Sequence, residues 1–132
     1  MHLSIITPEN TLFSGKADMV TAPGALGDFG VLPGHMPFVS SLRPGVITVV
    51  EGGLQVAHFA VTEGIAEITP DHCTILTQAA RSLENLSVAD AQAELRAADE
   101  ALTAAITTED TNAAERRKKM AETALALLYH HP

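Results

Sequence analysis

Short runs of apolar and β-branched residues alternate with glycine and proline over the first two thirds of the chain. Glycine and proline favour turns, and many short strands separated by frequent turns are typical of an antiparallel sandwich or barrel. The two runs on either side of Glu51-Gly52-Gly53 predict a β-hairpin that turns at the glycines. Strands are predicted over residues 3–7, 19–22, 29–32, 46–50, 54–61, 65–69 and 74–76.

The pattern changes after Leu86, where alanine, leucine, glutamate and arginine predominate. From Val88 to Ile106 apolar residues recur at every third or fourth position, which indicates one face of an α-helix. Ser87 is followed three residues later by Asp90, and this spacing fits the start of the helix with Ser87 as its N-cap.

A second helix is predicted after the polar run at 107–111, and Asn112 with Glu115 three residues later fits its start. The short link between the helices requires them to lie antiparallel. We therefore expect a β-sandwich over residues 1–86 and a C-terminal antiparallel hairpin of two helices over 87–132. The hairpin is rich in alanine, which buries little area, so it should rest on the sandwich or on another protein.

The chain is acidic, with a formal net charge of −8 from 8 Lys and Arg against 16 Asp and Glu. Nucleic acids and anionic membrane surfaces bind to basic patches, so the charge argues against both as partners. No run approaches 18 apolar residues and no basic-apolar leader opens the chain, so we expect neither a spanning helix nor a secretory signal. The single cysteine, Cys73, lies in an apolar run, which predicts a buried, unreactive thiol and a reducing compartment.

The residues that commonly carry chemistry lack the required spacing. The six histidines include no pair at i, i+4 and no His-x-His sequence, so no metal ligands are predicted. Nucleophile elbows, phosphate loops and dinucleotide fingerprints are also missing from the sequence, so we expect no catalytic residue and no cofactor. Two rival interpretations are a small β-barrel metal-dependent enzyme with a helical tail, and a free-standing adaptor domain.

Arg116, Arg117, Lys118 and Lys119 form the one dense basic run. A solvated helix face is the simplest interpretation, because four consecutive helical residues spread over about 300° of the circumference. The two lysines each have a glutamate four residues away with which to form an ion pair. The two arginines have none, which makes them the candidates for contact with an acidic partner.

Proline and glycine restrict the segment from Gly27 to Phe38, which reads GDFGVLPGHMPF. Proline fixes φ near −65° and glycine permits a positive φ, so such a loop has little conformational freedom. A loop of fixed shape suits a surface that is presented to a partner, and His35 within it is expected to be a turn residue that hydrogen-bonds locally or to that partner.

Several short motifs follow one another in a specific order and spacing. They are Phe13-Ser14-Gly15, the loop from Gly27 to His35 with Pro37, Arg43-Pro44-Gly45-Val46-Ile47, and the runs at 64–68 and 74–77. In this order they resemble the epsilon subunit family of bacterial F-type ATP synthases over nearly the whole chain. That family has a β-sandwich of about ten antiparallel strands followed by a helical hairpin.

The resemblance implies a non-catalytic subunit at the foot of the central stalk, between the gamma subunit and the c-ring. It would couple c-ring rotation through gamma to ATP synthesis, as a peripheral protein on the cytoplasmic face of the bacterial inner membrane. By motif match, Asp28 is expected near the polar loops of the c-ring. Pro33, Gly34 and His35 are expected near the gamma contact.

The resemblance also implies two properties of the hairpin. In some members the hairpin reaches the beta and alpha subunits, and basic residues of its second helix contact an acidic loop of a beta subunit and inhibit hydrolysis. Arg116 and Arg117 would be the counterparts of these basic residues. Members that bind ATP carry Leu/Ile-Asp-x-x-Arg-Ala at the start of the first helix. Here Ser87 replaces the acid and Asp90 replaces the arginine, so we expect little or no ATP binding.

Overall fold

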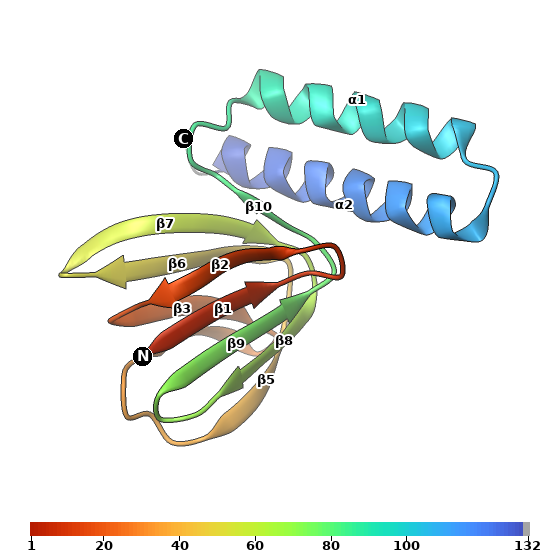
Figure 1. The fold of residues 1–132 in the computed structure, drawn as a ribbon. Coiled ribbons are helices and arrows are strands. Elements are labelled where there is room, and N and C mark those ends of the chain that lie inside the picture. Colours follow the sequence, from red (N-terminus) through yellow and green to blue (C-terminus); the bar gives the residue numbers. More distant parts are fainter. Residues whose placement is uncertain (131–132) are drawn as a thin grey trace.

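The computed structural model describes residues 1–130, and the last two residues of the predicted hairpin, 131 and 132, lie outside the described residues. Within them the chain first forms strands and then two helices (Figure 1), so a β-sandwich followed by a helical hairpin is confirmed. The elements are β1 (His2–Ile6), β2 (Thr11–Lys16), β3 (Met19–Gly24), β4 (Gly27–Val31), β5 (Phe38–Leu42), β6 (Gly45–Glu51), β7 (Leu54–Val61), β8 (Gly64–Ile68), β9 (His72–Thr77), β10 (Ala80–Ser82), α1 (Val88–Ala104) and α2 (Thr108–His130).

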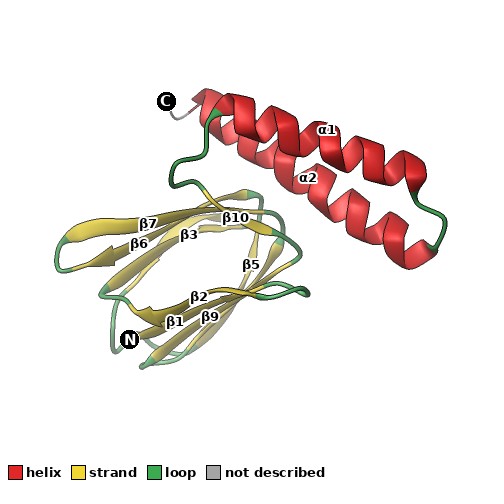
Figure 2. Ribbon diagram, turned by 45° about the horizontal axis from the view of Figure 1, so that its top comes forward, coloured by secondary structure: helices red, strands yellow, loops and turns green. Residues whose placement is uncertain are grey.

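The strands form two facing layers, with β7, β6 and β3 in one and β2, β1 and β9 in the other (Figure 2). The hydrogen-bonded order is β10-β7-β6-β3-β5-β8-β9-β1-β2, and β4 lies beside β3. The layers join where Gly24 of β3 pairs with Leu42 of β5. Apolar side chains from alternate positions fill the space between the layers, as the period of two along a strand requires. The largest fully buried aliphatic side chains are Leu3, Ile5, Ile47, Ile68, Ile75, Val20, Val31, Val49 and Val61.

One strand pair corrects the expectation of an antiparallel sandwich. β1 lies parallel to β9, with His2 opposite His72 and Ile6 opposite Leu76. A tight turn forces its two strands to be antiparallel, whereas β1 and β9 are separated by seven intervening strands. Their relative direction is therefore set by packing, which the local pattern of residues does not contain.

Three strands were not predicted from the sequence, namely β2, β5 and β10. β5 contains two serines, and β10 has only three residues and forms by pairing with Phe59, Ala60 and Val61 of β7. The predicted hairpin is confirmed, because Glu51 pairs with Leu54 and the two glycines between them both have positive φ, 61° and 77°.

Both helices begin with a side-chain cap. The Ser87 N-cap is confirmed: the backbone N–H of Asp90 donates to the Ser87 hydroxyl, and the Asp90 carboxylate accepts from the Ser87 N–H. The start of α2 at Asn112 was wrong, since the helix begins at Thr108 and the Thr107 hydroxyl accepts from the Asp110 N–H. A polar run can form either a loop or the capped first turn of a helix, and the run at 107–111 forms the cap and first turn of α2.

The hairpin packs beside the sandwich (Figure 1) and contacts it chiefly through α2, which lies against β6, β7 and β10. Between the helices the buried side chains are chiefly alanines, which allow close approach but bury little area. The apolar contact with the sandwich is smaller than the core between the layers: Met120 and Ala124 of α2 lie against Ala60 and Leu86, with Leu127, Leu128, Ala79 and Leu83 packed around them. The division into two folding units after residue 86 stays a prediction.

Cys73 is 1% exposed in the core, which confirms the predicted buried thiol. Burial raises the pKa of this thiol to about 11, since a thiolate would lose its hydration among apolar neighbours.

Candidate interaction surfaces

The structure does not bring Asp28 and His35 together. Asp28 lies near the beginning of β4, opposite Pro23 of β3. His35 follows the end of β4, in the loop that leads to β5. The two positions are therefore available to two different neighbours, and a single contact does not require both.

The loop after β4 is held in a fixed shape by its own backbone. Gly34 has a φ of 83°, which favours glycine, and its N–H donates to the Pro70 carbonyl at 2.7 Å. The His35 N–H closes the turn on the Leu32 carbonyl at 3.2 Å. The bond between Gly34 and Pro70 ties the loop to the β8–β9 turn. Pro33 stays exposed at the surface.

The His35 ring is engaged locally, as the sequence suggested. Its Nδ1 lies 2.9 Å from the Met36 carbonyl oxygen, and because a carbonyl only accepts, Nδ1–H is the donor. The ring centroid lies 5.0 Å from that of Phe38, which in turn contacts Phe29 at 5.5 Å. The loop is thus anchored on the aromatic edge of the core.

Asp28 has a partner that the sequence did not reveal. Its carboxylate accepts from the Arg43 guanidinium at 2.5 Å, and the same guanidinium donates to the Gly24 carbonyl. Arg43 was visible only as the first residue of an Arg-Pro-Gly turn motif. Nothing in the spacing of 15 residues predicts that this motif reaches back to β4.

The outer face of β5, β8 and β9 carries exposed aliphatic side chains that the sequence analysis did not single out. Val39, Ile65 and Leu76 are 69%, 48% and 46% exposed, and Ile65 lies opposite Leu76 in the sheet. Leu76 also lies opposite Ile6 of β1. Scattered exposed aliphatic residues are ordinary, whereas neighbouring ones on one face make a candidate contact surface. We call this group, with Ile6, the outer apolar face.

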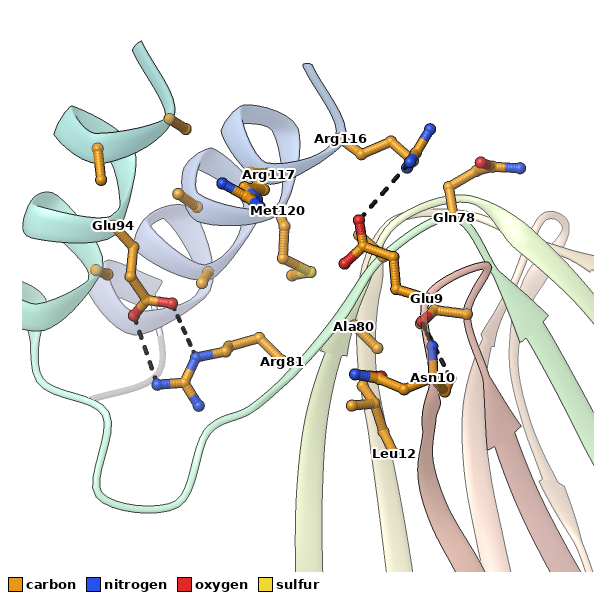
Figure 3. Close-up of a pocket in the computed structure, with 17 residues that line it drawn as sticks. Glu9, Asn10, Leu12, Gln78, Ala80, Arg81, Glu94, Arg116, Arg117 and Met120 are labelled. Atoms are coloured by element: carbon orange, nitrogen blue, oxygen red, sulfur yellow. Dashed lines mark hydrogen bonds and ion pairs between the residues drawn. The ribbon is translucent and has the colours of Figure 1, made fainter. Parts of the chain in front are cut away.

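A cavity of about 310 Å³ lies between the hairpin and the sandwich (Figure 3). Charged side chains span it on two sides. The Arg81 guanidinium donates to both carboxylate oxygens of Glu94 at 3.0 and 3.5 Å, and Arg116 lies 3.7 Å from Glu9 of the β1–β2 turn. The hairpin is therefore held to the sandwich around a space that side chains do not fill.

The basic run on α2 makes different ion pairs from those expected. Lys119 pairs with Glu63 of the sandwich at 2.5 Å, and Lys118 pairs with Asp99 of α1 at 3.1 Å. The prediction of pairs within α2 was wrong, because the docked sandwich and α1 offer carboxylates to the same lysines. The hydrogen bond to Asp99 raises the pKa of Lys118. Arg117 lines the cavity and forms no ion pair among residues 1–130.

Within residues 1–130, neither helix has the length and apolarity that a membrane span requires. Residues 1–130 also contain no group of three or more His, Cys, Asp or Glu that could hold a metal ion.

The sequence matches a known family and several curated relatives. The family described as ATP synthase, Delta/Epsilon chain, beta-sandwich domain, matches residues 1–82. The ATP synthase epsilon chain of Rhodospirillum rubrum is 41% identical over 125 residues, which cover 95% of this chain and 93% of the relative. That of Hyphomonas neptunium is 43% identical over 98 residues, covering 74% of this chain and 73% of the relative.

Solved structures with a similar fold come from mitochondrial ATP synthases. A chain of the Euglena gracilis assembly of OSCP, F1 and c-ring has a TM-score of 0.62 at 22% identity, covering 94% of this chain and 78% of that one. A chain of the Tetrahymena thermophila central stalk and c-ring has a TM-score of 0.54 at 20% identity, covering 98% and 94%. At these identities the likeness concerns the fold.

Proposed function

The chain belongs to the ATP synthase epsilon chain family, and from this we propose that it is a non-catalytic subunit of the central stalk that couples c-ring rotation through gamma to ATP synthesis. The observation that carries the proposal is the similarity over nearly the whole chain to epsilon chains. The rival interpretations, a metal-dependent barrel enzyme and a free-standing adaptor, are set aside on that ground. The family of stalk subunits also fits a peripheral position on the cytoplasmic face of the bacterial inner membrane.

The outer apolar face supports a gamma contact. Its outward residues are aliphatic, serine, threonine or histidine, and Glu67 is the only charged one on β5, β8 and β9. A sheet face with few charges loses little hydration when a partner covers it. The loop that contains Pro33 and His35 leads into β5, whose residue Val39 belongs to the outer apolar face.

Asp28 supports a separate contact with the c-ring. It is exposed at the other end of β4, and its charge is oriented by Arg43. Two separate contacts on one stiff sandwich suit torque transmission, because a compliant link would store rotation as local deformation.

Reconstitution tests the proposal directly. The ATP synthase of the source organism is stripped of its epsilon chain, incorporated into vesicles and supplied with the purified chain. We expect ATP-driven proton pumping per ATP hydrolysed to rise toward that of the intact complex. Absence of binding, or pumping that stays at the level of the stripped complex, would contradict the proposed function.

The hairpin gives the subunit an additional regulatory role in this proposal. Its apolar contact with the sandwich buries four residues against the fifteen of the core between the layers, and the remaining attachment is by exposed ion pairs, each of which contributes little to stability. Such a hairpin can leave its docked position at modest cost. Arg116 and Arg117 would then be free to contact an acidic loop of a beta subunit.

Deleting the chain from Ser87 onward is expected to raise ATP hydrolysis by the assembled complex about fivefold or more, the lower end of ordinary allosteric coupling. Replacing Arg116 and Arg117 together by alanine should produce much of the same increase. Arg96→Ala on α1, an exposed arginine on the other helix, serves as the matched control and should leave the rate unchanged. An unchanged rate after the deletion would remove the regulatory role.

We also expect no ATP binding by the isolated chain in the micromolar range. The Ser87–Asp90 pair closes the start of α1 on itself, and the Asp90 carboxylate occupies the place at the helix N-terminus where phosphate would bind. Isothermal titration calorimetry measures this directly. The double variant Ser87→Asp/Asp90→Arg restores the motif's charge pattern and should bind ATP more tightly than the natural chain. Micromolar affinity of the natural chain would overturn the prediction.

A further inference from the structure

We propose that Arg43 is a positioning residue, which clamps the β3–β4 turn so that Leu26 and the Asp28 carboxylate are presented in one fixed geometry as an anchor for a partner subunit. The partner surface that fits this anchor is an apolar pocket beside a cationic or hydrogen-bond-donating group. The inference rests on the proposed function, which places the partner subunit in the ATP synthase.

The β3–β4 turn projects a leucine into solvent. Gly24 and Gly27 are the last paired residues of the two strands, so Ala25 and Leu26 alone make the turn. Leu26 is fully exposed, and Ala25 is held from behind by a hydrogen bond from its N–H to the Ser41 carbonyl at 2.8 Å. A large aliphatic side chain at the tip of a fastened two-residue turn has no packing role in this chain.

Arg43 fastens both arms of this turn. Its guanidinium donates to the Gly24 carbonyl on β3 and to the Asp28 carboxylate on β4. Its backbone N–H donates to the Pro23 carbonyl at 2.9 Å. The planar guanidinium can hold two acceptors at once in a fixed geometry, which the single ammonium of lysine cannot do as well.

The base of the turn is closely packed. A Cβ on Gly24 would lie 2.5 Å from the Gly27 carbonyl oxygen, so the two strands meet as closely as backbones can. A Cβ on Gly45 would lie 2.7 Å from the Pro23 Cβ, so the corner before β6 presses on the same turn. These contacts give a physical reason for the Arg-Pro-Gly sequence. Arg43 supplies the clamp, and Gly45 has no side chain that would collide with Pro23.

The Asp28 carboxylate keeps one oxygen for a partner. Arg43 contacts Oδ1, and among the described residues Oδ2 accepts no hydrogen bond. The side chain is 74% exposed. A partner can therefore donate to Asp28 while Arg43 keeps its orientation. Anchors that are ordered before binding lose little conformational entropy on contact, so the clamp converts exposed groups into a binding determinant.

A double-mutant cycle tests the inference on the whole ATP synthase. Binding of the chain to the stripped complex is measured for the natural chain, Leu26→Ser, Arg43→Ala and the double variant. We expect each single variant to weaken binding about tenfold, and the double variant to weaken it little further, because Arg43 acts through the turn that carries Leu26. Arg43→Lys should fall between the natural chain and Arg43→Ala.

Two controls separate positioning from stability. Leu54→Ser removes another exposed leucine beside a tight turn, at the β6–β7 hairpin, and should leave binding unchanged. Thermal unfolding of isolated Leu26→Ser should match that of the natural chain, which would show that its loss of binding does not come from unfolding.

Additive losses in the double variant, equal losses for Leu54→Ser, or unaltered binding of Leu26→Ser would each overturn the inference. If the natural chain itself fails to bind, the proposed function fails, whereas normal binding of the natural chain and of all the variants overturns this inference alone.

Discussion

Gly64→Ala is expected to destabilise the sandwich by about 3 kcal/mol, the upper end of the cost of forcing extra atoms into a packed site. Gly64 pairs with Thr77 of β9 and with Leu42 of β5. An added Cβ would penetrate the Leu76 carbonyl oxygen and lie 3.0 Å from the Thr77 Cα and 3.1 Å from the Leu76 carbonyl carbon. All these atoms belong to the backbone, so no side-chain rotation relieves the overlap and the strands must separate.

Thermal or urea unfolding of the isolated chain measures this loss, and Gly15→Ala provides its matched control. Gly15 also lies in a strand, β2, but an added Cβ there would meet the Phe13 ring at 3.6 Å, an ordinary contact. We expect Gly15→Ala to change stability by no more than about 0.5 kcal/mol. Equal stability of the Gly64 and Gly15 variants would contradict the close approach of β8 and β9.

Ile75→Ala is expected to cost about 2–5 kcal/mol, because truncating a buried isoleucine loses apolar burial and leaves a cavity. Ile75 of β9 is fully buried between the layers. Total stabilities are about 5–15 kcal/mol, so this one change can remove a large share. Unfolding in urea, followed by circular dichroism, reports the shift in the midpoint.

Ile65→Ala makes the same chemical change on the neighbouring strand β8, with the opposite expected outcome. Its side chain is on the outer apolar face, so the isolated chain should lose no more than about 0.5 kcal/mol. Binding to the stripped ATP synthase should weaken instead, since a partner buries that side chain. If Ile65→Ala destabilises the isolated chain as much as Ile75→Ala, the assignment of an outer face is wrong.

Local residue patterns predicted much of the fold because turns and caps depend on neighbours in sequence. The glycine pair at the β6–β7 turn and the Ser87 cap are examples, since the relevant hydrogen bonds span only a few residues. The strands β2, β5 and β10 were missed for the complementary reason. β10 in particular exists because β7 offers it backbone partners, and its three residues carry no signal of their own.

The candidate surfaces followed the same division. Asp28 and His35 were singled out by their loop motif and were assigned to the c-ring and to gamma respectively, and the structure separates the two residues along β4. The lysines of α2 were assigned partners on their own helix, yet Glu63 and Asp99 take them. The role of Arg43 was not recognised, because its partner Asp28 lies 15 residues away in sequence. The outer apolar face was not recognised, because outward positions of a sheet are usually polar and here they are aliphatic.

The sequence by itself determined the family, the order of sandwich and hairpin, the turns and the first cap, because each depends on residue type or on neighbours a few positions away. Tertiary structure alone decided the parallel pairing of β1 with β9, the clamp of Arg43 on Gly24 and Asp28, and the ion pairs that hold the hairpin. These contacts join distant segments, and which distant groups meet is decided only when the two layers close over a shared core.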